Sequence, residues 1–191
     1  MPRLFTGIEI PVEIQEQLAA IKGPVPGARW IEPADLHLTL RFAGDIDNRT
    51  AQDFADHLAA IDIDAFELRL EGLRVFGGND PSSIWIGVAP SPALETLARA
   101  NERAARAAGL PPVSRGFKPH VTVARLKHAR SDALTRLLQR HGGLKCEPFL
   151  VSRFVLFSSR PSKGGGPYIV EEAFPTRGGV HGAWSDQEIG W

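Results

Sequence analysis

The sequence has almost no cysteine and no excess of charge of either sign. Its 191 residues include one cysteine, Cys146, so an internal disulfide is excluded, and no cluster of Cys and His has the spacing of a structural zinc site. With only Lys145 beside it to lower its pKa, we predict that Cys146 is an inert thiol. The 22 Lys and Arg residues balance 22 Asp and Glu residues. Because non-specific binding to long nucleic acids depends on an excess of basic residues, this balance argues against that class of function.

A long hydrophobic run is also missing. Residues 1–11 contain no apolar stretch long enough for a signal peptide or a membrane span, so we expect a cytoplasmic protein without a membrane contact. Hydrophobic residues make up 43% of the chain and charged residues 23%, close to the globular average, which excludes a disordered or collagen-like chain. A chain of this length buries enough surface to fold without disulfides or metals, and we expect a monomer.

Helices and strands alternate along the chain. Apolar residues that recur at every second position predict strands at residues 3–10, 28–31, 36–43, 66–75, 84–89, 120–126, 148–158 and 168–174. Helical spacing of apolar residues predicts helices that begin near Pro11, Asp47, Ser91 and Ser131. Asp47 or Asn48, Ser91 before Pro92, and Ser131 are the expected capping residues. The turn-rich residues 77–81 join two strands without a helix, which favours a mostly antiparallel α+β fold over a doubly wound parallel sheet.

The composition changes after residue 175. Residues 176–191 combine glycines and polar residues with Trp184 and Trp191. We therefore predict a single domain at residues 1–175 and a loosely ordered tail at residues 176–191. The run Ser-Lys-Gly-Gly-Gly at residues 162–166 lacks the residue order of a phosphate-binding P-loop, and it predicts a hairpin loop.

A weak internal repeat carries the candidate chemistry. The first copy is His37-Leu38-Thr39-Leu40 and the second is His120-Val121-Thr122-Val123, nearly half the chain away. In each copy the His and the Thr are two residues apart in a β-prone run, so both side chains leave the same face of a strand. Two lobes related by a pseudo-two-fold axis would bring the two His–Thr pairs face to face.

Paired histidines suit the cleavage of a phosphodiester. The reaction needs a base for the nucleophile and an acid for the leaving oxygen, and two imidazoles with pKa values near ~6.5 can share these tasks at one pH. A hydroxyl beside each imidazole can donate a hydrogen bond to a phosphate oxygen. A 2′,3′-cyclic phosphate is strained, so no metal or other cofactor is required. One His-x-Thr alone is more often structural, but two matched copies favour catalysis.

The surroundings of both copies resemble a known family, the 2H phosphoesterases, and within it the RNA 2′,3′-cyclic phosphodiesterases, also called 2′-5′ RNA ligase-like proteins. The matching segments outside the repeat are Arg3-Leu4-Phe5, Arg29-Trp30-Ile31-Glu32-Pro33 and Phe117-Lys118-Pro119. The resemblance covers residues 1 to about 175. It implies a bilobal fold in which two mostly antiparallel sheets, with outer helices, surround a central cleft. It also implies a metal-independent hydrolase of RNA processing that opens 2′,3′-cyclic phosphates at RNA ends to 2′-phosphates.

The resemblance assigns roles to the motif residues. It implies that His37 is the general acid for the leaving 3′ oxygen and that His120 is the general base for water. Thr39 and Thr122 are expected to hold the phosphate.

The family also uses the residue five positions after each motif histidine. Here Phe42 would stack on the base and Arg125 would bind phosphate. Because five is odd, strict alternation places both side chains on the strand face opposite the histidines, so a β-bulge or a strand end is needed to turn them back. Otherwise Phe42 is a core residue and Arg125 a surface or inter-strand residue.

Three functions remain open at this point. The first is hydrolysis of cyclic phosphates on RNA 3′ ends or oligonucleotides. The second is the reverse transesterification, a 2′-5′ RNA ligase. The third is a non-catalytic nucleotide- or RNA-binding module that uses the same cleft. The presence of both His37 and His120 favours catalysis, because a binding module needs neither both imidazoles nor their matched positions.

Overall fold

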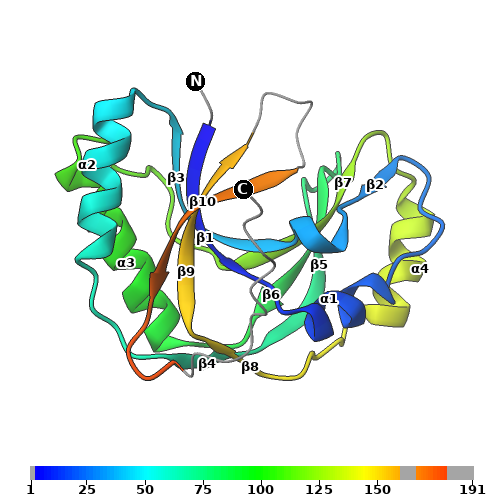
Figure 1. Ribbon diagram of the computed structural model, residues 1–191. Coiled ribbons are helices and arrows are strands. Elements are labelled where there is room, and N and C mark those ends of the chain that lie inside the picture. The colour runs from blue at the N-terminus through cyan, green and yellow to red at the C-terminus, as the bar shows by residue number, and fades with distance from the viewer. Residues whose placement is uncertain (1–2, 160–166, 180–191) are drawn as a thin grey trace, which may run out of the picture.

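The computed structural model describes residues 3–159 and 167–179 (Figure 1). The helices of this part are α1 (Val12–Ala19), α2 (Asn48–Ala59), α3 (Pro92–Ala107) and α4 (Ser131–His141), with one 3₁₀ turn, η1, at Pro33–Asp35. The strands are β1 (Arg3–Glu9), β2 (Ala28–Trp30), β3 (His37–Asp45), β4 (Phe66–Leu68), β5 (Leu70–Phe76), β6 (Ser83–Val88), β7 (His120–Leu126), β8 (Phe149–Val151), β9 (Arg153–Ser159) and β10 (Tyr168–Pro175).

Within the described residues, eight strands form one antiparallel sheet in the order β10-β9-β1-β3-β7-β6-β5, with β2 also paired to β7. Strands β3 and β7 meet through one residue pair, Leu38 with Val121. The sheet therefore has two halves, β10-β9-β1-β3 and β7-β6-β5 with β2. The predicted α+β class is confirmed, and the two expected sheets correspond to these halves.

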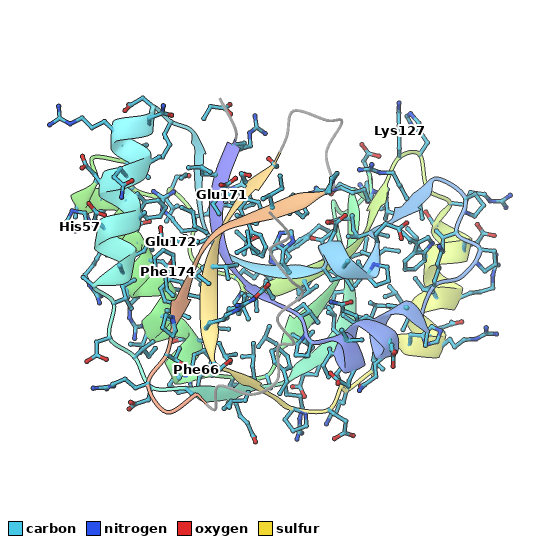
Figure 2. The ribbon with its side chains drawn as sticks, in the orientation of Figure 1. His57, Phe66, Lys127, Glu171, Glu172 and Phe174 are labelled. Carbon is cyan, nitrogen blue, oxygen red and sulfur yellow. The ribbon has the colours of Figure 1, made fainter. Side chains whose placement is uncertain are left out.

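Helices cover each half separately. Figure 1 shows α2 and α3 beside the half that contains β3, and α1 and α4 beside the half that contains β5 and β7. Apolar residues from the sheet and all four helices form one continuous core, in which Leu38, Ile84 and Val121 are fully buried. Phe174 on β10 stacks on Phe154 of β9, with ring centroids 5.0 Å apart, and closes the core at the sheet edge (Figure 2).

The helix starts follow the expected capping residues in two cases out of three. The Asp47 carboxylate accepts a hydrogen bond from the Thr50 N–H at 2.9 Å, and the Ser91 hydroxyl accepts one from the Leu94 N–H at 3.2 Å. The prediction that Ser131 caps α4 is wrong. Ser131 is the first helical residue, and Arg130 precedes it without a capping side-chain hydrogen bond.

Two predicted strands are each divided in the structure. The strand expected at residues 66–75 is β4 and β5, and the strand expected at residues 148–158 is β8 and β9. The reason is a change of partner, because β4 and β8 pair with each other while β5 pairs with β6 and β9 with β1 and β10. A periodicity of two persists across such a change and does not reveal it.

The first residues after β10 are tied to the body. The Arg177 N–H donates to the Ile63 carbonyl at 2.9 Å, and the Ala65 N–H donates to the Arg177 carbonyl at 2.8 Å. The rest of the predicted tail, including Trp184 and Trp191, and the loop predicted at residues 162–166 lie outside the described residues. In the part that is described, no helix is both long and apolar enough to cross a membrane.

Candidate active site

The pair that joins β3 to β7 lies at the centre of the two motifs. Leu38 and Val121 are both 0% exposed and point to the helix-covered side of the sheet. Because side chains alternate along a strand, the His and the Thr of both motifs emerge together on the opposite face. The strands are antiparallel, so the histidine of each motif lies toward the threonine of the other. The structure thus brings the four predicted residues to one place.

Phe42 returns to this face through a β-bulge. On β1, Phe5 and Gly7 are two residues apart and share a face, and they pair with Phe42 and Thr39, which are three apart. One extra residue of β3 is therefore accommodated between Thr39 and Phe42. Phe42 is 59% exposed, so the interpretation of this residue as a core phenylalanine is wrong.

A β-bulge also follows the second motif. On β6, Ser83 and Trp85 share a face and pair with Arg125 and Thr122 of β7, with a register shift between them. Arg125 therefore stands on the same face as Thr122, and its side chain is exposed. We call His37, Thr39 and Phe42 the first half-site, and His120, Thr122 and Arg125 the second half-site.

Both imidazoles are oriented in the same way. Nδ1 of His37 lies 2.8 Å from the Asp35 carbonyl oxygen, and Nδ1 of His120 lies 2.7 Å from the Lys118 carbonyl oxygen. A carbonyl oxygen can only accept, so Nδ1 carries the proton in each ring. Nε2 is then the atom that accepts a proton when the ring is neutral and donates one when the ring is charged. In both histidines, therefore, Nε2 is the atom available for proton transfer.

The surroundings of His37 are aromatic. Its ring centroid lies 4.7 Å from that of Tyr168, 4.9 Å from that of Phe5 and 5.6 Å from that of Phe157. Burial lowers the pKa of His37, an effect that the hydrogen bond to the Asp35 carbonyl opposes. The neutral ring is thus favoured before an anion binds.

The surroundings of His120 combine aromatic and basic side chains. Its ring lies edge-on to Phe76 at 5.3 Å and to Trp85 at 5.7 Å. The Lys118 ammonium lies 5.1 Å from the centroids of both of these rings, and the Arg74 guanidinium lies 5.6 Å from that of Trp85. Two basic side chains therefore lie against the aromatic rings that contact the second histidine.

Tyr168 belongs to the site, although the sequence reasoning did not find it. This residue is the first of β10, its ring contacts that of His37, and the positive charge of Arg125 acts on its hydroxyl. Its N–H donates to the Asp35 carboxylate at 3.2 Å. Burial raises the pKa of Tyr168, so the hydroxyl keeps its proton at neutral pH. Its one sequence signal is that it is the only tyrosine in the chain.

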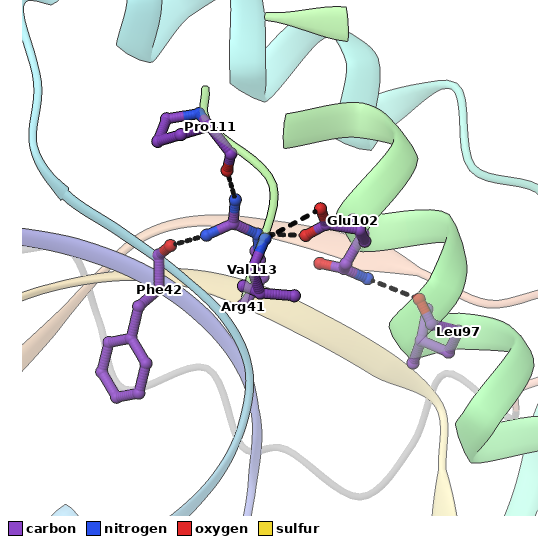
Figure 3. Close-up of polar contacts among 7 residues, drawn as sticks. Arg41, Phe42, Leu97, Glu102, Pro111 and Val113 are labelled. Carbon is purple, nitrogen blue, oxygen red and sulfur yellow. Dashed lines mark hydrogen bonds and ion pairs between the residues drawn. The ribbon is translucent and has the colours of Figure 1, made fainter. Parts of the chain in front are cut away.

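An ion pair between buried Arg41 and partly exposed Glu102 supports the bulge of β3. Arg41 is 7% exposed, and its Nε donates to the Glu102 carboxylate of α3 at 2.5 Å (Figure 3). The same guanidinium donates to the carbonyls of Phe42 and Pro111, and Glu102 also accepts from the Val113 N–H at 3.3 Å. Arg41 therefore connects the bulge to α3 and to the segment that leads into β7.

The other reactive residue types do not add to this site. Cys146 is 3% exposed, and burial raises the pKa of its thiol to about 11, in agreement with an inert residue. Across residues 3–159 and 167–179, no three His, Cys, Asp or Glu side chains are arranged to hold a metal ion.

The chain is similar in sequence to one family and to named members of it. The model of the 2′-5′ RNA ligase superfamily matches residues 10–162. The chain is 33% identical to a protein of Aeropyrum pernix named RNA 2′,3′-cyclic phosphodiesterase, over 73% of this chain and 81% of that one. A protein of the same name from Aquifex aeolicus is 32% identical, over 90% of this chain and 96% of that one.

A solved structure supports the fold. The crystal structure of E. coli LigT complexed with 3′-AMP superposes with a TM-score of 0.75 at 24% identity, and the match covers 93% of this chain and 99% of LigT. The chain thus shares sequence along most of its length with one family, and it shares its architecture with LigT. The chain belongs to the 2′-5′ RNA ligase superfamily.

Proposed function

We propose that this protein is a metal-independent RNA 2′,3′-cyclic phosphodiesterase, which hydrolyses the cyclic phosphate at an RNA 3′ end to a 2′-phosphomonoester. The names of its relatives support the activity. The observation that carries the proposal is the identical anchoring of two imidazoles on one open face, each through Nδ1 to a backbone carbonyl. This arrangement leaves two Nε2 atoms available for one substrate.

In the proposed reaction, water attacks phosphorus and the bond from phosphorus to the 3′ oxygen breaks. Nε2 of neutral His120 takes a proton from the water, and Nε2–H of charged His37 gives a proton to the leaving oxygen. The hydroxyls of Thr39 and Thr122 donate to the non-bridging oxygens, where negative charge increases in the transition state. Exchange with solvent restores both protonation states after the product leaves.

The lowered pKa of His37 has a consequence for this cycle. Burial favours the neutral ring in the free protein, whereas the acid role requires the charged ring. A phosphate anion bound beside the ring favours the charged form and raises its pKa again. We infer that His37 takes up its proton together with substrate, so that the acid is formed only in the complex.

The remaining residues position the nucleotide. Phe42 offers an exposed aromatic face for the terminal base, and stacking of this kind accepts any base. Arg125 supplies a permanent positive charge with two parallel donors for phosphate. The charge of Arg125 acts on both His37 and Tyr168, so its guanidinium lies near the first histidine.

The 2′-5′ ligase reaction remains a second candidate, because the family bears that name and the same two imidazoles can serve it. His120 would take the proton from an RNA 5′-hydroxyl in place of water, and His37 would give one to the leaving 3′ oxygen. A binding-only module is disfavoured, since binding does not require two anchored rings. The test is incubation of adenosine 2′,3′-cyclic phosphate with the protein in excess EDTA, with a parallel joining assay on RNA ends. We expect the 2′-phosphate in the presence of EDTA. Absence of product in both assays would contradict catalysis, and product in the joining assay alone would favour the ligase.

A further inference from the structure

A second arginine accompanies Arg125 on the open face. Arg29 of β2 is the direct cross-strand partner of Arg125 of β7, and both side chains are exposed. Residues directly opposite one another in an antiparallel pair project from the same face, with Cβ atoms about 5 Å apart. Arg29 therefore stands on the face that carries the two half-sites.

The pairing pattern also shows on which side of β7 Arg29 lies. Ala124 of β7 pairs with Ile84 of β6 and with Trp30 of β2, so β2 lies on the side of β7 away from β6. Strand β3 occupies that same side, through the pair of Leu38 with Val121. Arg29 is thus directed toward the first half-site and contributes to the electrostatic field at Tyr168, as Arg125 does.

Opposite charges are the usual cross-strand pair, so two arginines directly opposite one another depart from the local rule. Such departures occur mainly at functional sites. The chain as a whole has no net charge to attract RNA, with 22 basic and 22 acidic residues. A local pair of guanidinium groups beside the histidines is therefore suited to bind more than one phosphate.

We propose that Arg29 forms a subsite for the phosphate on the 5′ side of the terminal nucleotide. The inference rests on the proposed function and narrows its substrate class to oligonucleotides, or 5′-phosphorylated nucleotides, that end in a 2′,3′-cyclic phosphate. Arg125 shares the strand face of Thr122, its charge acts on His37, and it serves the phosphate that reacts. Arg29 lies on the adjacent strand. It binds the next phosphate along the RNA chain, and this phosphate does not react.

The test compares three substrates. These are adenosine 2′,3′-cyclic phosphate, its 5′-phosphorylated form, and the dinucleotide ApA with a terminal 2′,3′-cyclic phosphate. For the unmodified protein, we expect kcat/KM about tenfold higher for both substrates that carry the additional phosphate, mainly through KM, since a charge-assisted hydrogen bond contributes an effect of this size. Arg29→Gln is expected to reduce this preference to near one, and Arg29→Lys to leave part of it.

Lys127→Gln is the matched control. Lys127 is an exposed residue of the segment after β7, at the edge of the molecule in Figure 2, and its loss removes one positive charge outside the two half-sites. We expect this variant to keep the full preference. If Lys127→Gln lost the preference as Arg29→Gln does, general electrostatic attraction would account for it and the subsite would be refuted.

The outcomes separate the inference from the function on which it rests. Equal kcat/KM for all three substrates in the unmodified protein would overturn the subsite while hydrolysis stands. A preference for the dinucleotide alone would also overturn it, because a second base rather than a phosphate would then be recognised. A preference that survives in Arg29→Gln would place the phosphate elsewhere. If none of the three substrates is hydrolysed, the proposed function itself is refuted.

Discussion

The first and second half-sites follow the same backbone path but differ in their surroundings. In both, a His-x-Thr strand segment is followed by a bulge that returns the fifth residue to the open face. The rings of Phe5, Phe157 and Tyr168 enclose His37. Basic residues accompany the second half-site instead, with Lys118 and Arg74 on the aromatic rings that contact His120 and Arg29 opposite Arg125. In the proposed mechanism, the threonines of both half-sites hold the reacting phosphate. The first half-site also receives the base, and the arginines beside the second supply positive charge for the phosphates.

The bulges are also supported in different ways. Ala124, in the bulge of β7, has a pairing strand on each side. Beyond Leu38, β3 pairs with β1 alone among the described strands, and at the corresponding position Arg41 bonds to the Phe42 and Pro111 carbonyls in place of a second strand. The comparison indicates that a side chain can replace a strand where the two halves of the sheet diverge.

The largest effect is expected from loss of either histidine. We predict that His37→Ala and His120→Ala each lower kcat/KM by at least ~10²–10⁴-fold, because each removes one proton-transfer group from a pair that acts as a unit. The double variant should be little worse than either single variant. Circular dichroism would verify the fold, and full activity in either single variant would refute the two-imidazole mechanism.

The threonines should have a smaller and nearly equal effect. Thr39→Ala or Thr122→Ala removes one preorganised donor, and we expect kcat/KM to fall by ~10²–10³-fold or less, with partial recovery in the corresponding Ser variants. Steady-state kinetics on a cyclic nucleotide measures this. An unchanged rate in one threonine variant would show that the half-sites do not hold the phosphate together.

Arg41 provides a test of the asymmetry between the bulges. Arg41→Met leaves the carboxylate of Glu102 without its cation, and we expect a loss of about 3 kcal/mol of unfolding free energy in urea, the lower part of the range for a buried pair. The double variant Arg41→Met/Glu102→Leu should recover much of the lost unfolding free energy, because no unpaired carboxylate remains. Arg99→Met breaks only exposed contacts on the same helix, the ion pair with Glu95 and the hydrogen bond to Thr96, and should cost under ~1 kcal/mol. A double variant no more stable than Arg41→Met would contradict the ion-pair explanation.

The smallest effect concerns the base. Phe42→Leu keeps an apolar side chain but removes the aromatic face, and we expect KM to rise about tenfold with little change in kcat, in line with ~1–3 kcal/mol per stacked base. The increase should be similar for all four nucleoside 2′,3′-cyclic phosphates. A lower kcat at constant KM would instead assign Phe42 to the support of the first half-site.

Much of this arrangement was predictable from local patterns. Alternation and flanking turns indicate β3 and β7, and the matched His-x-Thr copies indicate the four central residues. The odd spacing of Phe42 from His37 required a bulge, which the structure contains in both half-sites. Tyr168 and Arg41 were not predictable in this way, because their roles depend on partners far away in the sequence, such as Arg125 and Glu102. Periodicity carries no information on such contacts.

The shared use of two imidazoles is tested most directly by the pH dependence of hydrolysis. A neutral base and a charged acid together predict a bell-shaped pH profile of kcat/KM. Its acid and alkaline limbs report the pKa values of the two histidines as a coupled pair. Because burial lowers the pKa of His37 and a bound phosphate raises it, the alkaline limb should lie at higher pH in kcat than in kcat/KM. A bell-shaped profile with this displacement, unchanged by EDTA, is the expected result, and a flat profile between about pH 5 and 9 would contradict the mechanism.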